Sequence, residues 1–131
     1  MKKVDIKGTG SCIPDRIVPN SYFEKILDTT DEWIIARTGI QTRRMIEPGQ
    51  ALTDLATPAS KRALEMAEIS PKELDIIIVG TSSADMLSPS AACIPRALDE
   101  AVRSGQIRRG DLILVNSFGA GFTGGAALFR Y

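Results

Sequence analysis

Histidine is absent from this sequence of 131 residues. Its absence excludes the Ser-His-Asp and Cys-His arrangements of nucleophilic catalysis, and any metal site with histidine ligands. Cysteine is almost as scarce, since only Cys12 and Cys93 are present. Two thiols so far apart form no disulfide framework and do not favour a zinc site, and free thiols suit a reducing compartment. The sequence therefore predicts no metal centre.

Long hydrophobic runs and an excess of charge of either sign are also missing. The longest aliphatic run covers residues 76–79, far fewer than the roughly 20 apolar residues that span a bilayer. Asp5 and Lys7 interrupt any apolar signal core after Met1. Sixteen basic and sixteen acidic residues cancel, so no net field favours nucleic acid or an anionic membrane. We expect a cytoplasmic protein that binds neither.

The pattern of what is present predicts an α/β fold. Hydrophobic residues make up 44% and charged residues 24% of the chain, which is typical of a soluble globular protein, and the length favours one domain. Alternating or β-branched runs predict strands over residues 4–6, 41–45, 75–81, 112–118 and 126–131. Helical periodicity and capping signals predict helices over residues 20–25, 31–38 and 52–67, near 71–74, and from about 97 to 104.

Local signals refine several of these elements. Gly8 to Gly10 predicts a turn after the first strand, and Asn20 predicts the N-cap of a short helix. Pro58 does not suit a helix interior, so we expect the regular part of that helix to start just before it. The continuous run within residues 75–81 predicts a buried strand.

Further signals concern loops and caps. Pro14 and Pro19 predict a loop between them, and residues 82–90 predict a polar loop. Thr30 or Asp31 is expected to cap the next helix, and Gly39 to end it. Residues 70–73 read as a capping box with proline at the first helical position.

Two motifs allow both a chemical and a plain interpretation. Residues 119–124 fit G-x-G-x-x-G after a strand, but a dinucleotide site needs a following helix and a second strand, and only seven residues remain. A tight β-turn is favoured, although its glycines would also let backbone N–H groups approach a ligand oxygen. Cys93 precedes a helix, where a thiol can become nucleophilic, but without histidine as a base a small buried cysteine is favoured. Cys12 is interpreted in the same way.

Trp33, the only tryptophan, lies four residues before Arg37 on one predicted helix. Residues at this spacing share a helix face and their side chains can meet. One interpretation is a half-buried indole with the guanidinium stacked on it as a cation–π pair. The other is a flat clamp for a planar base such as adenine. Spacing alone favours the first.

Several motifs occur together in the order seen in one enzyme family. They are Ile6-Lys7-Gly8-Thr9-Gly10-Ser11, the Pro14 turn, Thr29-Thr30-Asp31-Glu32-Trp33-Ile34, Arg37-Thr38-Gly39-Ile40, Ser90-Ala91-Ala92-Cys93, Ala97-Leu98-Asp99-Glu100-Ala101 and Phe118-Gly119-Ala120-Gly121-Phe122-Thr123. The chain thereby resembles the β-ketoacyl-acyl-carrier-protein synthase III family. Residues 1–92 resemble the N-terminal part of such an enzyme and residues 93–131 its extreme C-terminal part, so the resemblance implies an internal truncation with a seam near Ser90-Ala91-Ala92.

The resemblance implies a partial thiolase-like fold, a layered α/β architecture that lacks its central part, and one compact unit if the chain folds. The family is an acyltransferase that condenses acetyl-CoA or another acyl-CoA with malonyl-acyl-carrier protein, which initiates fatty-acid synthesis. Acyl-CoA is a substrate there rather than a permanently bound cofactor. The implied partners are acyl-CoA and acyl carrier protein. The family is homodimeric, and this chain is expected to aggregate or associate through unpaired strands.

Site residues carry over position by position. Trp33 and Arg37 match the residues that hold the adenine end of CoA, and Thr29 matches a nearby CoA contact, which raises the clamp interpretation above the cation–π one. Phe118 matches an aromatic residue near the active-site thiol. The backbone N–H of Ala120 matches a position that contributes to the oxyanion hole.

The departures from the family concern catalysis. No Ala-Cys-Ala-Gly-Phe-like nucleophile motif is present, and Cys93 matches a non-catalytic cysteine. The family's histidine and its Gly-Asn-Thr-Ser asparagine are also missing, and Asn116 is not a substitute. Ser88 stands where a loop aromatic is normal. We therefore predict a chain that is inactive in condensation on its own. The alternatives are a non-catalytic module that binds CoA or associates with a synthase, and a different α/β binding module for which the resemblance reflects ancestry alone.

Overall fold

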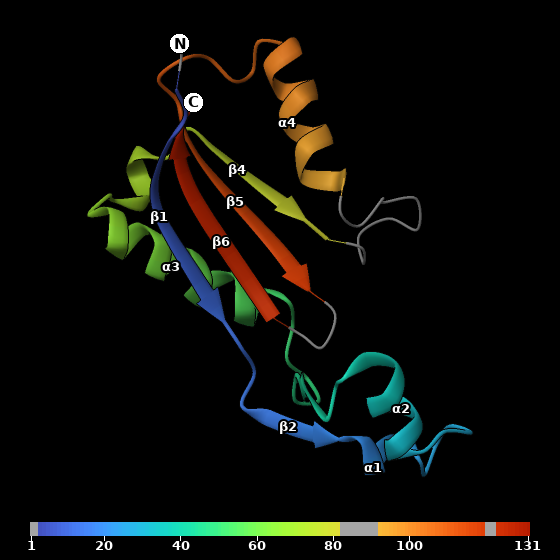
Figure 1. Cartoon of the computed structure of the whole chain (residues 1–131). Helices are drawn as coiled ribbons and strands as arrows, with labels where there is room; N and C mark the ends of the chain where they lie inside the picture. The colour runs from blue at the N-terminus through green and yellow to red at the C-terminus, as the bar shows by residue number, and fades with distance from the viewer. Residues whose placement is uncertain (1–2, 82–91, 120–122) are drawn as a thin grey trace.

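The computed structural model describes residues 3–81, 92–119 and 123–131. Its main body is a four-stranded sheet in the order β1-β6-β5-β4, formed by Asp5–Cys12, Thr123–Arg130, Leu112–Gly119 and Ile76–Gly80. β1 and β5 both pair antiparallel with β6, while β4 runs parallel to β5. Strands from the beginning, middle and end of the chain therefore form one mixed sheet in an α/β fold, with both termini at the same end of the sheet (Figure 1).

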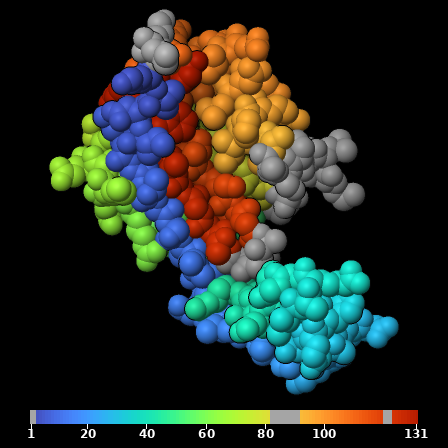
Figure 2. Space-filling view, viewed as in Figure 1, coloured from blue at the N-terminus to red at the C-terminus, as the bar shows by residue number. Residues whose placement is uncertain are grey.

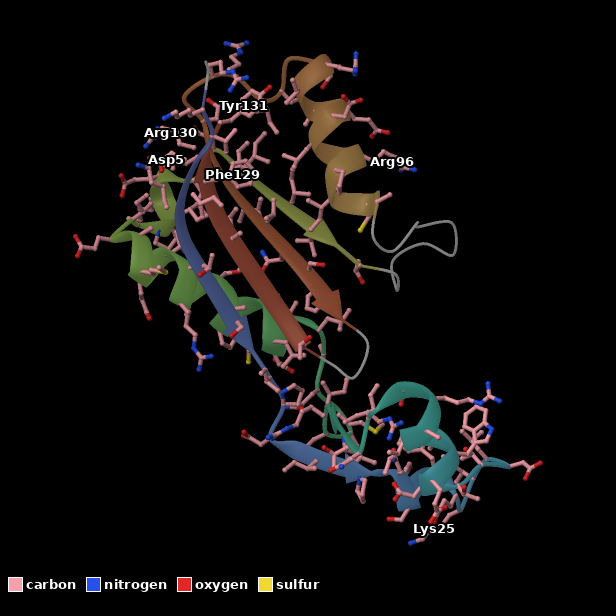
Figure 3. The ribbon with its side chains drawn as sticks, in the orientation of Figure 1. Asp5, Lys25, Arg96, Phe129, Arg130 and Tyr131 are labelled. Atoms are coloured by element: carbon pink, nitrogen blue, oxygen red, sulfur yellow. The ribbon has the colours of Figure 1, made fainter. Side chains whose placement is uncertain are left out.

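Two helices cover different parts of this sheet. α3, Thr53–Ala67, lies on one face over β1 and β6, and α4, Cys93–Arg103, lies on the side of β4 (Figure 1). The core under α3 is aliphatic and contains Ala59, Ala63, Leu114 and Leu128. A second cluster joins Ile78, Ile107 and Ile113 to the apolar face of α4 and to Phe129 and Tyr131. The labelled Phe129 and Tyr131 lie near the two chain ends in Figure 3.

A smaller lobe projects from one end of the sheet (Figure 2). It consists of β2, Arg16–Pro19, α1, Asn20–Phe23, α2, Asp31–Thr38, and β3, Thr42–Met45, and β2 pairs antiparallel with β3. Outside this lobe, between α3 and β4, Pro71–Glu73 forms a 3₁₀ turn that carries the predicted reciprocal capping box between Ser70 and Glu73. None of the helices in the described part of the chain has the length and apolarity that crossing a bilayer requires.

The predicted turn at the first glycines is wrong, because Gly8 and Gly10 lie inside β1. Their role is close packing of two backbones. A Cβ at Gly8 would stand 2.1 Å from the carbonyl oxygen of Ala63, and one at Gly10 would stand 2.1 Å from that of Ala59. Only glycine lets β1 come this close to α3.

Three further expectations need correction. The predicted loop between the two prolines contains β2. The helix expected to start near Pro58 begins at Thr53 and contains the proline. Proline removes one backbone donor there, and Asp54 supports the preceding turn by accepting a hydrogen bond from the Ala51 N–H at 2.8 Å. The predicted buried strand over residues 75–81 is buried only in part, since Ile77 and Val79 are 57% and 53% exposed.

β3, β5 and α2 lie where the sequence predicts them, whereas β6 begins at Thr123 and α4 at Cys93, each earlier than predicted. The glycine-rich segment joins two antiparallel strands, with Gly119 paired to Thr123. β6 thus follows it directly, and the helix that a dinucleotide site requires is absent from residues 123–131. The predicted loop over residues 82–90, including Ser88, and Ala120 lie outside the described residues.

Candidate functional site

The projecting lobe holds the predicted binding residues on a short, well-capped helix. The Thr30 hydroxyl accepts a hydrogen bond from the Trp33 N–H at 3.1 Å, and Asp31 and Glu32 place negative charge in the first turn of α2. Gly39 ends the helix in the left-handed region with φ of 70°. Both ends of α2 are thus determined by local sequence, as predicted, and Trp33 and Arg37 are one turn apart.

Trp33 and Arg37 meet on the surface of α2. The guanidinium carbon of Arg37 lies 4.9 Å from the indole centroid, which confirms the predicted contact. The Trp33 residue nevertheless remains 54% exposed. An exposed indole that already carries a cation offers a flat apolar surface together with a positive charge.

A buried asparagine holds the lobe together. Asn20 is only 1% exposed, and its Nδ2 donates to Asp31 Oδ1 at 2.7 Å and to the carbonyl oxygen of Ile40 at 2.8 Å. Its Oδ1 accepts a hydrogen bond from Arg43. The predicted N-cap role is wrong, since the cap position of α1 is Pro19 and Asn20 is the first helical residue. The amide instead joins α1, α2 and β3 in one network, which no local sequence signal reveals.

A pocket of about 560 Å³ opens beside Trp33. That volume is within the range of small-molecule sites. Its lining is mainly apolar, with Asp28 and Arg43 supplying one charge of each sign; the lining residues are Phe23, Leu27, Asp28, Thr29, Trp33, Ile34, Thr38 and Arg43. The Arg43 guanidinium carbon lies 4.4 Å from the Phe23 ring centroid. Two cation–aromatic pairs therefore lie at or beside one pocket.

Thr29 provides a polar group in this lining that is otherwise unused. Its Oγ1 is buried and has no hydrogen-bond partner among the described residues. An unsatisfied buried hydroxyl costs about 1–3 kcal/mol, so most such groups in native proteins have a partner. A polar atom of a bound ligand would satisfy this hydroxyl. The sequence-predicted Thr29 and Trp33 share the pocket, while Arg37 stands over the indole outside the lining.

The other candidate residues do not join this pocket. Phe118 lies half-buried near the end of β5, opposite Gly124, and is not among the lining residues. Cys93 is half-buried at the first turn of α4 and lies against Gly80. Cys12 is half-buried beside the core under α3. The described residues contain no cluster of acidic and cysteine side chains able to hold a metal ion.

Comparison with known proteins shows which enzymes the chain resembles. A sequence profile described as 3-oxoacyl-[acyl-carrier-protein (ACP)] synthase III C terminal matches residues 88–131. The β-ketoacyl-[acyl-carrier-protein] synthase III of Caldanaerobacter subterraneus subsp. tengcongensis is 56% identical over 92 residues, which are 70% of this chain and 28% of that enzyme. The chain is thus similar in sequence to β-ketoacyl-acyl-carrier-protein synthase III enzymes over most of its own length. The enzyme of the same name from Clostridium acetobutylicum is 50% identical over 94 residues, 72% of this chain and 29% of its own length.

Solved structures agree on the fold. The chain superimposes on 3-oxoacyl-(acyl carrier protein) synthase III of Pseudomonas aeruginosa PAO1 with a TM-score of 0.75 and 21% identity, covering 99% of this chain and 51% of that one. The priming β-ketosynthase of the R1128 polyketide pathway gives a TM-score of 0.73 at 26% identity with the same coverages. The architecture is thus a partial thiolase-like fold. The chain spans under a third of the length of its curated synthase III relatives.

Proposed function

We propose that this chain acts in the chemistry of β-ketoacyl-acyl-carrier-protein synthase III and contributes recognition of the CoA end of an acyl-CoA. The observation that carries the proposal is the pocket beside Trp33, where the unsatisfied Thr29 hydroxyl lies in an aromatic-lined cavity. CoA combines a planar adenine with phosphates. The exposed indole suits the adenine, and the Arg37 and Arg43 cations suit the phosphates.

We do not propose that the chain alone catalyses the condensation reaction. Joining an acyl group to malonyl-acyl-carrier protein calls for an activated nucleophile and groups that stabilise developing negative charge. The sequence contains no histidine and no match to the family's nucleophile or asparagine motifs. Three further proposals depend on the resemblance alone. They are that acyl carrier protein is a partner, that the chain forms a homodimer like that of the family, and that Phe118 and Ala120 lie beside an acyl site.

We also propose that residues 1–92 correspond to the N-terminal part and residues 93–131 to the extreme C-terminal part of a synthase III, with the middle missing. The match of a C-terminal family profile to residues 88–131 supports the second assignment. One relative is 56% identical over 92 residues, and these cover only 28% of its length. This supports a chain that contains only part of a synthase III sequence. The shared sheet would give both parts a common core, because β1 pairs with β6 and β4 pairs with β5.

Titration of the single tryptophan with CoA tests the binding role. We expect saturable quenching of Trp33 fluorescence, competition by adenosine 3′,5′-bisphosphate and no competition by pantetheine. Arg37→Ala should weaken binding by about 3- to 10-fold, the size of an exposed cation–π or charge contact. Thr29→Val keeps the shape of the side chain and should weaken binding by a similar factor.

Arg96→Ala is the matched control for these variants, since Arg96 lies on the outer side of α4 (Figure 3) and pairs with Glu100. It should leave CoA binding unchanged. An unchanged tryptophan spectrum at millimolar CoA would remove the binding role. Malonyl-carrier-dependent product formation by the pure chain, lost on mutation of Cys93, would overturn the assignment of inactivity and would leave the binding result to be judged separately.

A further inference from the structure

Two side chains of α3 close the outer edge of β1. This strand is the first in the sheet order, so within the described part of the chain its outer backbone groups face no further strand. The Thr9 N–H donates a hydrogen bond to the Met66 sulfur at 3.4 Å. Arg62, one helical turn before Met66, donates to the carbonyl oxygen of Ser11. A thioether thus serves as the acceptor for a backbone donor at this edge, where α3 runs alongside β1 (Figure 1).

Close packing of β1 on α3 gives this sulfur a fixed position. Gly8 and Gly10 face α3 and let the two backbones approach, so Thr9 between them points to the other side of the sheet. The Met66 side chain reaches around the strand edge, and the Thr9 hydroxyl also donates to its sulfur, at 3.7 Å. A thioether is only a weak hydrogen-bond acceptor. Two donors therefore converge on an atom that satisfies them poorly.

Met66 is also accessible to small molecules in solution. The residue is 67% exposed, whereas Met45, the other methionine within the described residues, is half-buried in β3. Oxidation of a sulfur-containing side chain depends on its exposure. Methionine sulfoxide disrupts a hydrophobic core because it is polar, but Met66 belongs to neither of the two core clusters. An oxygen atom added to its sulfur would therefore displace no core contact.

From these observations we infer that Met66 is a modification site for hydrogen peroxide, and that its sulfoxide closes the β1 edge more firmly than the thioether does. The sulfoxide oxygen is a stronger acceptor than the thioether sulfur for the two Thr9 donors. Because the sulfur already lies beside both donors, the modification strengthens a contact that exists. Methionine sulfoxide reductases reverse this modification, so the edge has two interconvertible states. The inference does not depend on the proposed CoA role.

The oxidation is a direct oxygen transfer that needs no further reactant. A lone pair of the Met66 sulfur attacks one oxygen of hydrogen peroxide, so that an S–O bond forms and the O–O bond breaks. The departing hydroxide takes the proton of the transferred hydroxyl and leaves as water. The sulfur is oxidised by two electrons, and the peroxide is reduced by the same two electrons.

Peptide mass spectrometry of the full chain, after timed treatment with hydrogen peroxide, tests the reactivity of Met66. In the folded chain Met66 should be oxidised about threefold faster than Met45 or more, because oxidation follows exposure. In urea the two rates should converge. Far-UV circular dichroism should stay unchanged once Met66 is oxidised. Equal rates in the folded chain, or a loss of dichroism that accompanies Met66 oxidation, would overturn the inference.

Hydrogen exchange of the Thr9 amide, followed by NMR, separates a bonded sulfoxide from a merely exposed methionine. Peroxide should slow this exchange by about threefold or more, and methionine sulfoxide reductases should restore the original rate. Met66→Leu keeps the size of the side chain without an acceptor, so its Thr9 amide should exchange faster than in wild type and ignore peroxide. Met45→Leu is the matched control and should keep the wild-type response.

Two outcomes of the exchange measurement would contradict the inference. If peroxide leaves the Thr9 amide of the wild type unchanged, or speeds its exchange, Met66 is a plain surface residue. If the response to peroxide persists in Met66→Leu, another group causes it. CoA titration of the same samples reports on the binding role separately, because Thr9 and Met66 are not among the residues that line the Trp33 pocket.

Discussion

Replacing Asn20 with alanine removes the side chain that joins three elements of the projecting lobe. The change deletes two donated hydrogen bonds, at 2.7 Å to Asp31 and 2.8 Å to the Ile40 carbonyl, and the bond accepted from Arg43. Two of the three partners are charged. A bond to a charged group is worth about 1.5–3 kcal/mol and a neutral one about 1 kcal/mol. Asp31 and Arg43 are half-buried and can be partly rehydrated, so we expect a net loss of about 2–3 kcal/mol.

The tryptophan provides a probe for this loss, because Trp33 is the only one and lies in the lobe. Urea unfolding should be followed by Trp33 fluorescence for the lobe and by far-UV circular dichroism for the whole chain. With a slope of about 1–1.5 kcal/mol per molar for a small unit, the fluorescence midpoint should fall by about 2 M. The dichroism midpoint should fall less if the lobe opens separately from the sheet.

Asn116→Ala is the matched control for Asn20→Ala. Asn116 is the other buried asparagine, 3% exposed in β5, and its Oδ1 accepts one hydrogen bond from Ser60 at 2.9 Å. Its loss should affect the dichroism signal more than Trp33. If the free energy of unfolding from the Trp33 transition of Asn20→Ala lies within about 0.5 kcal/mol of the wild-type value, the role of the network is refuted. An equal displacement of the Trp33 midpoint by both variants would refute it as well.

Three further substitutions test the local structure. Gly10→Ala should lower the free energy of unfolding by about 3 kcal/mol or more, because its Cβ would stand 2.1 Å from the Ala59 carbonyl oxygen. Its control is Gly125→Ala, where a Cβ would meet nothing within 4 Å and the free energy of unfolding should change by less than about 0.5 kcal/mol. Thermal melts compare the two variants. Thr30→Ala should cost about 1 kcal/mol in the Trp33 urea transition through loss of the N-cap, and an unchanged midpoint would contradict that cap. Gly39→Ala should cost about 1–2 kcal/mol in the same transition, since φ is 70°, and a stabilised variant would count against this backbone conformation.

Predictions from the sequence succeeded where the signal was local. Thr30 and Gly39 delimit α2 through their own caps, and the capping box at Ser70 forms as predicted. The aliphatic run before Asn116 also predicts β5 correctly. In each case neighbouring residues determine the backbone, so one window of sequence contains the necessary information.

The failures come from contacts between distant segments. Gly8 and Gly10 resemble turn residues until the backbone of α3 is seen against them. A continuous β-branched run resembles a buried strand, but whether Ile77 is buried depends on which helix covers β4. Asn20 resembles a cap, and its three partners are 11 to 23 residues away. Tertiary packing decides all three cases.

The same distinction applies to the candidate site. The sequence predicts the contact between Trp33 and Arg37 because both lie on one helix face, and the family resemblance adds Thr29. The rest of the pocket was not predicted, since Phe23, Ile34 and Arg43 come from three different elements. Aromatic and basic residues near the helix were visible in the sequence, but only the pairing of β2 with β3 brings Arg43 to the Phe23 ring.

The most direct test of a folded chain with a formed Trp33 pocket is a thermal melt followed by near-UV circular dichroism, with and without CoA. Near-UV signal from Trp33 requires fixed packing around the indole, and a ligand that binds only the folded state raises the midpoint. We predict one sharp transition that moves to higher temperature as CoA is added. A weak, gradual change, or a sharp transition that CoA does not move, would contradict the claim.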